Sequence, residues 1–540
     1  MRMNRVLKGV AVTSALALAL TACGGSGDGG GAAADGVVTA HNTEPENGLI
    51  PTSTSEVGGG RVVDLIYAGL YSYAQDGSLQ EELAESVESE DNVTWTVKLK
   101  EGQTFSDGSP VTASSFVDAW NYGADSDNAQ KASYFFNTIK GFKDSDEEGA
   151  DELSGLTVVD ETTFTVELMG PESDFPLRLG YSAYKPLPEV AFEDMAAFGE
   201  QPVTNGPYIL AEDGWQHNVE MELVPNEDYE GPRAPKNNGI TFTIYENYES
   251  GYQDLVSGHL DVMDQMPPNA LDTYEDDLEG RASSRAYAGN ANMVIPGYLK
   301  EFEGEPGKLR RQAISMAIDR QAIIDTVFKG TKEVAKEFTA PVLDGYSEDI
   351  PGSEVLEYDP KKAKELWDEA DAISPWPEGK VLKYTSNVDG AGNREYIEAI
   401  TNQLRNNLEI EAELDAISTF QEMRQIVSED GLEGISRAGW QADYPSLYNF
   451  LGPLFGTGAS SNDGRYSSEE FDAKLQEGLQ ADSVEEGAQF FNEAQEILFE
   501  DLPALPLWYQ ANQAGWSADV TNVEQGWDGV PLYYNIETVE

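Results

Sequence analysis

The sequence predicts an α/β fold built from two or three domains, and three observations support that prediction. Strand and helix patterns alternate along the chain, as where Leu382–Val388 is followed by Arg394–Leu408. Thr94–Lys100 alternates strictly between polar and apolar residues, which is typical of a half-buried strand. The chain has 540 residues, of which 40% are hydrophobic, and this length exceeds what one hydrophobic core accommodates.

Residues 1–22 have the pattern of an export signal. Three basic residues stand among the first eight, and Gly9–Leu20 is apolar. That apolar run is shorter than the ~20 residues that a membrane-spanning helix needs. It ends in Leu20-Thr21-Ala22-Cys23, which resembles a bacterial lipobox. We therefore expect residues 1–22 to be a lipoprotein signal peptide.

Cys23 is the only cysteine of the chain. Attachment of a lipid to Cys23 explains a lone thiol in an exported protein, and an ordinary cleaved signal with an incidental cysteine is the alternative. No disulfide can form within the chain. Residues 24–34 are Gly, Ser, Ala and one Asp, so we expect residues 23–36 to be the lipidated cysteine and a flexible linker.

The charge of the chain limits its partners. There are 97 acidic and 34 basic residues, which gives a net charge of −63. This balance argues against nucleic acid and against anionic lipid as partners. It also means that a ligand carboxylate would enter against a repulsive field, so that a specific arginine would be needed to hold it.

The first half of the chain has mostly strand patterns. A helix is expected at Gly60–Gly69, where Val62, Val63, Ile66 and Tyr67 have helical spacing. Two more helices are expected, at Ala113–Asn121 and at Ser250–Val262. The expected strands are Val37–Ala40, Thr94–Lys100, Leu156–Val159, Phe164–Leu168, Tyr208–Leu210, Glu220–Pro225 and Ile240–Ile244.

The second half has mostly helix patterns. Ile314, Ala317 and Ile318 share one face of an expected helix, and Asp319 can cap a following helix at Ala322–Phe328. The remaining expected elements are helices at Asp359–Ala370 and Arg394–Leu408, and strands at Leu382–Val388 and Leu432–Ser436.

The stretch Arg437–Pro445 sets a cation and an anion six positions apart, Arg437 and Asp443, with Trp440 and Tyr444 beside them. We expect a backbone bend at Gly439, with both charges at or just past a strand end. Fully extended, the segment would separate the two charges by about 20 Å, and a bend would shorten this. An extended tripeptide spans ~7 to 10 Å, so one loop could hold both ends of a short zwitterion. The alternative is that Arg437 and Asp443 pair with each other or with neighbouring chain.

Several segments resemble one family of proteins. Arg437-Ala438-Gly439-Trp440-Gln441-Ala442-Asp443-Tyr444, the run from Trp95 to Trp120, and Leu309–Arg320 are similar to segments of bacterial oligopeptide and dipeptide solute-binding lipoproteins. These family 5 extracellular solute-binding proteins serve ABC importers. The resemblance implies that Asp443 holds the amino terminus of a peptide and Arg437 its carboxyl terminus. Gln441 stands where family members commonly have a cysteine that forms a disulfide.

The resemblance also implies an architecture and a location. We expect a two-lobed fold like that of periplasmic binding proteins, with an extra domain inserted in the first lobe. The expected parts are a lobe I core (37–67, 200–292 and 510–540), an inserted domain (68–199) and lobe II (293–509). The protein would be a monomer on the extracytoplasmic face of a Gram-positive cell membrane, anchored through Cys23, and would deliver short peptides to a membrane permease.

Other functions have weaker support in the residues. His41, His217 and His259 are scattered, and the acidic run Asp144–Gly149 lacks the glutamate that a calcium loop requires twelve positions along, so no metal or other cofactor is expected. No nucleophile elbow or zinc-protease motif is present, although a hydrolase that uses only carboxylates stays an alternative. A third possibility is the same fold with an oligosaccharide or a metal complex as its ligand. Trp440 and Tyr444 would suit peptide or sugar, or could be core residues.

Overall fold

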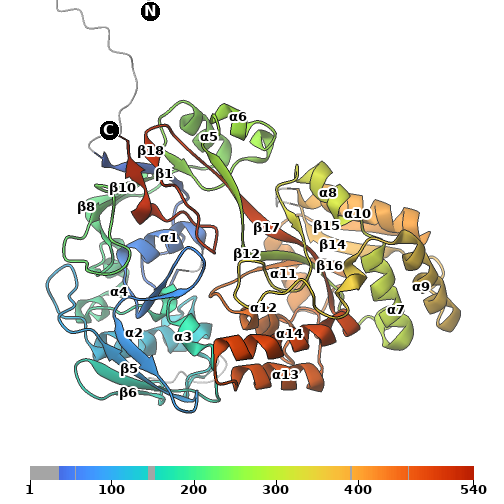
Figure 1. Cartoon of the computed structure of the whole chain (residues 1–540), viewed down its shortest axis with the longest axis horizontal. Helices are drawn as coiled ribbons and strands as arrows, with labels where there is room; N and C mark the ends of the chain where they lie inside the picture. Colours follow the sequence, from blue (N-terminus) through green and yellow to red (C-terminus); the bar gives the residue numbers. More distant parts are fainter. Residues whose placement is uncertain (1–35, 55, 144–151, 389–391, 460, 540) are drawn as a thin grey trace, which may run out of the picture.

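The computed structural model describes residues 36–54, 56–143, 152–388, 392–459 and 461–539. Cys23, the signal peptide, most of the linker and the run Asp144–Gly149 lie outside this part of the chain. Two halves of the molecule lie side by side, and two long strands cross between them (Figure 1). This arrangement agrees with the predicted α/β fold of two lobes.

The largest sheet has eleven strands among the described residues and runs through both halves. The crossing strands are β12 and β17, which pair antiparallel with each other. In order across the sheet the strands are β15 (Ala412–Ile417), β14 (Leu382–Asn387), β16 (Ile435–Gln441), β12 (Ala282–Val294), β17 (Ala504–Trp516), β11 (Val262–Met263), β1 (Val38–Asn42), β10 (Ile240–Ile244), β9 (Glu220–Pro225) and β8 (Tyr208–Gln216), with β13 (Glu333–Val334) pairing to β17.

The pairing of β12 with β17 is irregular where the two halves meet. Ala286 faces Ala511 and Asn290 faces Tyr509, so β12 has two more residues than β17 across this interval. Such a bulge bends a strand and interrupts its pairing. The interruption lies at the point where β12, which pairs only with β17 up to there, begins to pair with β16 as well.

Three smaller sheets lie within the half that contains the amino terminus. The four-stranded sheet includes β5, whose residues alternate between exposed and buried as its sequence predicted. The strands are β4 (Ala84–Glu88), β5 (Thr94–Leu99), β7 (Thr163–Glu167) and β6 (Leu156–Val158) in one sheet, β2 (Tyr71–Tyr73) with β3 (Leu79–Glu81), and β18 (Val520–Thr521) with β19 (Glu537–Thr538).

Most of the expected helices form close to their expected positions. The expectation of one helix at Ser250–Val262 is wrong, because α5 ends at Val256, Gly258 has a left-handed backbone conformation, and Val262 lies in strand β11. Asp319 caps its helix as expected, because its carboxylate accepts the N–H of Ala322 at 3.0 Å. The helices are α1 (Val57–Ile66), α2 (Ala113–Ala124), α3 (Phe175–Arg178), α4 (Met195–Glu200), α5 (Tyr248–Val256), α6 (Tyr274–Asp277), α7 (Gly304–Met316), α8 (Arg320–Val327), α9 (Pro360–Ile373), α10 (Asn393–Leu408), α11 (Phe420–Ser428), α12 (Leu447–Phe455), α13 (Glu469–Leu479) and α14 (Val484–Asp501).

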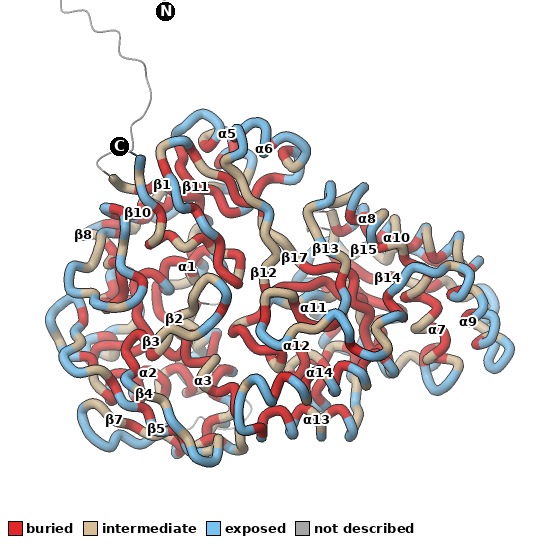
Figure 2. Tube along the Cα trace, in the orientation of Figure 1, coloured by how far each residue is buried: buried red, intermediate tan, exposed pale blue. Residues whose placement is uncertain are grey.

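Two large hydrophobic cores correspond to the two halves. One joins buried residues between Val38 and Val262 with others near the carboxyl terminus, and the second joins residues between Ala288 and Trp508. Buried segments follow the sheets and the inner helix faces (Figure 2). The first core is continuous through residues expected in the lobe I core and in the inserted domain. The boundary between those two parts stays a prediction.

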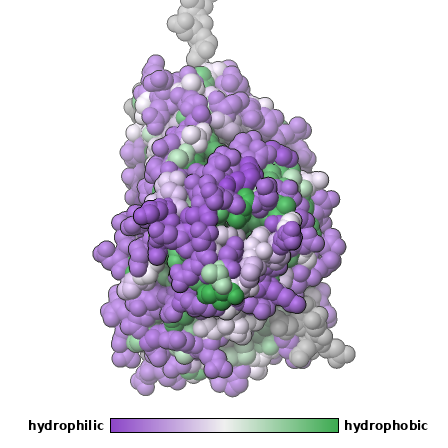
Figure 3. All heavy atoms as spheres, turned by 90° about the vertical axis from the view of Figure 1, so that its right-hand side faces the viewer, coloured by the Kyte–Doolittle hydropathy of each residue, from purple (hydrophilic) through white to green (hydrophobic). Residues whose placement is uncertain are grey.

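The end of the molecule that lies on the right in Figure 1 is strongly polar. The face turned to the viewer in Figure 3 is mainly hydrophilic, with only small apolar areas. In the described part of the chain, no helix combines the length and the apolar character needed to cross a bilayer.

Candidate functional site

Two cavities share Gln441 as a wall residue. The first, here called the Asp443 cavity, has a volume of about 390 Å³ and is walled by α1, β2, residues 180–182, 441–443 and 526–534. The second, called the Arg437 cavity, has a volume of about 840 Å³ and is walled largely by β12, β16, β17 and α11. Both volumes are in the range of small-molecule sites.

Strand β16 connects the two cavities. It pairs with β12 without interruption from Ser436 to Gln441, and Arg437 faces Met293 within this ladder. The expected bend at Gly439 is therefore wrong, and so is the placement of Arg437 past a strand end. A Cβ atom on Gly439 would lie 2.8 Å from the carbonyl oxygen of Asn290, so the glycine allows two strands to approach closely.

Strand β16 continues through Gly439 to Gln441, and Arg437 and Asp443 line different cavities and do not form an ion pair. The strand separates the backbones of Arg437 and Gln441 by about 13 Å, and two further residues lead to Asp443, so the two charged residues are at most about 20 Å apart along the backbone. The alternative in which the two charges pair with each other is thereby excluded.

Asp443 lies just after β16 and is held by Asn449. The carboxylate accepts Asn449 Nδ2 at 3.2 Å, and Asn449 Oδ1 accepts the Asp443 N–H at 3.0 Å and Trp440 Nε1 at 2.9 Å. No basic side chain among the described residues forms an ion pair with Asp443. Burial raises the pKa of its carboxyl to about 6. A cation supplied by a ligand would compensate this charge.

Arg437 faces the other cavity. Its guanidinium donates to Asn387 Oδ1 at 3.4 Å and lies beside Tyr396. No carboxylate within the described residues forms an ion pair with it. Lys332 lines the same cavity, donates to Gln510 Oε1, and has its pKa lowered to about 8 by burial. Two cations that form no ion pair among the described residues give this cavity groups to which an anion could bind.

The two aromatic residues of the motif have different surroundings. Trp440 is partly buried, lines the Arg437 cavity and packs against the second hydrophobic core. Tyr444 is only 4% exposed and lines neither cavity. The guanidinium of Arg178 lies over its ring, 5.2 Å from the centroid. Contact of Tyr444 with a ligand stays a prediction. In the structure the ring packs in the first hydrophobic core.

Several residues of the cavities were not found from the sequence. Lys332, Arg61, Ser72 and Asp528 lie in four separate segments that only the tertiary structure brings to these walls. No local motif marks them. Among the described residues, no group of three or more His, Cys, Asp or Glu side chains is arranged to hold a metal ion.

A comparison with protein families decides the affiliation. The profile described as "Bacterial extracellular solute-binding proteins, family 5 Middle" matches residues 78–462. The chain belongs to this family. Family 5 members are extracellular solute-binding proteins, which agrees with the resemblance seen in the sequence.

Individual relatives cover nearly the whole of this family 5 chain. It is 26% identical over 517 residues to the oligopeptide-binding protein OppA of Bacillus subtilis, covering 91% of this chain and 92% of that one. It is 27% identical over 487 residues to the dipeptide-binding protein of Lactococcus lactis, covering 84% and 86%. The fold matches an unliganded open form of the murein tripeptide-binding protein MppA with a TM-score of 0.79 at 21% identity, covering 94% and 98%.

Proposed function

We propose that this family 5 chain captures short peptides between its lobes and delivers them to the membrane permease of an ABC importer. One observation carries the proposal. Asp443 and Arg437 form no ion pair among the described residues, and they line two cavities that share Gln441, the last residue of β16. A zwitterionic peptide supplies both missing charges, because its ammonium would pair with Asp443 and its carboxylate with Arg437. The named relatives that bind oligopeptides and dipeptides support the same ligand class.

The uninterrupted course of β16 bears on the length of the peptide. An extended peptide gains about 3.3 to 3.6 Å per residue, so a tripeptide spans less than the about 13 Å of strand between Arg437 and Gln441, and two more residues lead on to Asp443. We therefore propose ligands of about four to six residues for the conformation described.

The rest of the proposal follows from the leader and from the two lobes. Lipid on Cys23 would tether the domain at the extracytoplasmic membrane surface, and residues 24–36 would let it move there. The lobes, with the expected boundaries at residues 293 and 509, would close about β12 and β17 and bury the peptide. The chain would act as a monomer and release its ligand chemically unchanged.

Calorimetry with a series of alanine peptides tests this function. We expect binding to strengthen from three to about five residues and then to level off. Acetylation of the peptide amino terminus should cost about 2 to 5 kcal/mol, because Asp443 would stay buried without a counter-charge. Amidation of the carboxyl terminus should weaken binding through Arg437.

Three results would contradict the proposal in separate ways. Equal affinity for acetylated and free peptides would remove the role of Asp443. Recovery of hydrolysed peptide after incubation with the protein would show that the protein is an enzyme and does not release its ligand unchanged. Absence of binding by every peptide, with a sugar or metal complex found by mass spectrometry of the purified protein, would replace the ligand class.

Binding should depend on pH below neutrality. The pKa of Asp443 is about 6 in the ligand-free chain, and only its ionised form attracts an ammonium group. Affinity should therefore be nearly full at pH 7 and above, be about halved at pH 6, and fall more steeply below pH 6, approaching tenfold per unit. Calorimetry between pH 5 and 7.5 measures this, since the peptide ammonium stays charged there. A flat profile would show that Asp443 does not hold the charged terminus.

A further inference from the structure

Asp528 is one of three further carboxylates, with Glu56 and Asp64, that line the Asp443 cavity. It stands in the loop Gly526–Val530, where its Oδ1 accepts the N–H of Val530 at 3.0 Å. No donor within the described residues bonds its other oxygen. Burial raises the pKa of this carboxyl to about 6. Asp528 therefore resembles Asp443, because each has one oxygen held by a neutral donor and neither forms an ion pair, although Arg61 lies close enough to Asp528 to lower the pKa of its carboxyl.

The other charges of this cavity are already compensated. Arg61 pairs with Asp264 at 2.6 Å, and Arg233 pairs with Glu82 at 2.8 Å. Asp64 pairs with Lys185 at 2.6 Å. Glu56 accepts the N–H of Gly59 at the start of α1. Among the described residues that line the cavity, the two aspartates carry charge without an ionic partner or a helix-capping role.

An independent observation marks the cavity as a binding site. Ser72 lines it and is 5% exposed, yet its hydroxyl has no hydrogen-bond partner. The Nε–H of Arg61, which is 7% exposed and lines the same cavity, is also unpaired. Buried polar groups are normally satisfied, so such groups in a cavity wall indicate a ligand. The Arg61 Nε–H needs an acceptor, which a peptide carbonyl oxygen supplies and a cationic side chain does not, while the Ser72 hydroxyl can accept a hydrogen bond from a cation.

The position of Asp528 is fixed by the strands that join the two lobes. The carbonyl oxygen of Trp527 accepts the Ala288 N–H of β12 at 2.8 Å, and that of Gly529 accepts Asn512 Nδ2 of β17 at 3.2 Å. Gln441 Nε2 of β16 lies 3.4 Å from the Asp528 carbonyl oxygen. The loop is therefore held beside the segment that presents Asp443.

The walls suit an organic cation. Tyr73 and Trp527 line the cavity, and their rings meet edge to face at 5.2 Å between centroids. Tyr181 and Tyr533 also contribute to the lining. Aromatic rings beside carboxylates favour ammonium and guanidinium groups through cation–π attraction and charged hydrogen bonds.

We propose that the Asp443 cavity takes a second positive charge of the ligand, a lysine or arginine side chain on one of the first two residues of a bound peptide, with Asp528 as its counter-charge. This inference rests on the proposed function, because Asp443 is taken to hold the peptide ammonium. It adds a side-chain preference that the family affiliation does not supply.

Calorimetry on the full chain with pentapeptides tests the preference without any substitution. The peptides carry lysine at position 1, 2 or 5 of an alanine sequence, and each is compared with a partner that carries norleucine at the same position. We expect lysine to bind about 10- to 100-fold more tightly than norleucine at position 1 or 2. At position 5 we expect little difference, which controls for general attraction to an acidic protein.

The variant Asp528→Asn should bring the ratio of the lysine and norleucine dissociation constants close to 1. Glu524→Gln removes one exposed charge from the preceding segment and should leave that ratio at the wild-type value. The ratio is informative even if a variant binds all peptides more weakly.

Each result decides between the two proposals. If the alanine pentapeptide binds but lysine gives no advantage at positions 1 and 2, this inference is wrong and the proposed function stands. An advantage that persists in Asp528→Asn, or that disappears equally in Glu524→Gln, also overturns the inference. If no peptide binds, the proposed function falls and this inference falls with it.

Discussion

Replacement of Asp443 by asparagine should weaken peptide binding by about 2 to 5 kcal/mol, because the peptide ammonium would lose its counter-charge in a buried site. The same change should stabilise the ligand-free protein. The pKa of Asp443 is about 6 in the folded chain, above the value of about 3.9 for an unfolded aspartate. Its ionised form is thus disfavoured by folding, and asparagine removes that penalty while keeping an oxygen acceptor for Asn449.

The size of the stability effect of Asp443→Asn depends on pH. A carboxyl whose pKa is raised by folding contributes most stability below its unfolded pKa and loses it as the pH rises through its folded pKa. Asp443→Asn should therefore raise the melting temperature at pH 7.5 and have no such effect near pH 4. Calorimetry and thermal unfolding at both pH values measure the two effects.

Asp228→Asn is a suitable control for this experiment. Asp228 is exposed, lies outside both cavities, and has no ion-pair partner among the described residues. It should change neither binding nor the melting temperature. A loss of binding in Asp443→Asn that comes with a lower melting temperature at pH 7.5 would indicate general damage to the fold and would contradict the assigned role.

The sequence predicted the elements whose signals are local. The alternation of Thr94–Lys100 became β5, and Asp319 became a helix cap, because each pattern depends on residues only a few positions apart. The prediction at Gly439 was wrong because glycine permits a bend without requiring one. Pairing of β16 with β12, which lies far away in sequence, decided the conformation.

The candidate site could be predicted only in part for the same reason. Asp443 and Arg437 stand in one motif, so the resemblance to a family indicated them. Asp528 and Lys332 reach their cavities through long-range packing, and a sequence rich in acidic residues gives no reason to select one aspartate. Their importance depends on which charges are left without partners, and this depends on the ion pairs that the other residues form.

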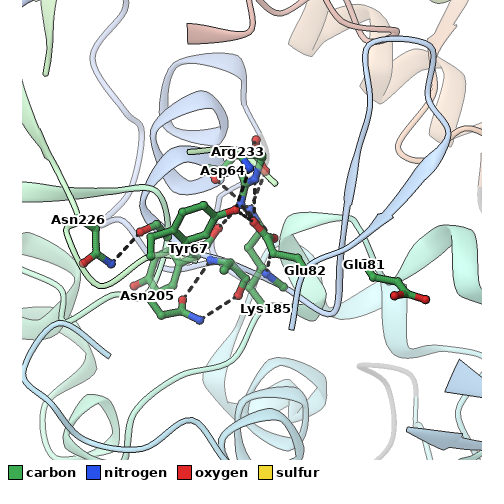
Figure 4. Close-up of polar contacts among 12 residues, drawn as sticks. Asp64, Tyr67, Glu81, Glu82, Lys185, Asn205, Asn226 and Arg233 are labelled. Carbon is green, nitrogen blue, oxygen red and sulfur yellow. Dashed lines mark hydrogen bonds and ion pairs between the residues drawn. The ribbon is translucent and has the colours of Figure 1, made fainter. Parts of the chain in front are cut away.

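A second large effect, on the stability of the fold, is expected at Arg233. Its side chain is 2% exposed and lies against α1 and the segment around Glu82. Figure 4 shows its guanidinium among Asp64, Tyr67 and Glu82. It donates to Glu82 at 2.9 and 3.1 Å, to the Tyr67 carbonyl at 2.9 Å and to the Asp64 carbonyl at 2.6 Å. Arg233 thus connects the end of α1 (Asp64 and Tyr67) with the segment around Glu82.

Arg233→Met should destabilise the protein by about 3 to 5 kcal/mol, because Glu82 would remain buried without its counter-charge. Glu82 is 3% exposed, and its other donors are the Gly69 N–H and the Tyr229 hydroxyl. Urea unfolding of the ligand-free chain measures the loss. Arg394→Met removes an exposed arginine paired with Glu398 on α10, and it should change stability by no more than about 0.5 kcal/mol.

The double variant Arg233→Met with Glu82→Gln separates the charge effect from the packing effect. Glutamine has nearly the shape of glutamate but no charge, so it should recover a large part of the stability lost in the single variant. The recovered part measures the cost of the stranded Glu82 carboxylate. The remainder measures the lost bonds to the Asp64 and Tyr67 carbonyls together with the lost ion pair between Arg233 and the Asp64 carboxylate, 3.2 Å apart. If the double variant is no more stable than Arg233→Met, the buried charge of Glu82 is not what makes Arg233 necessary.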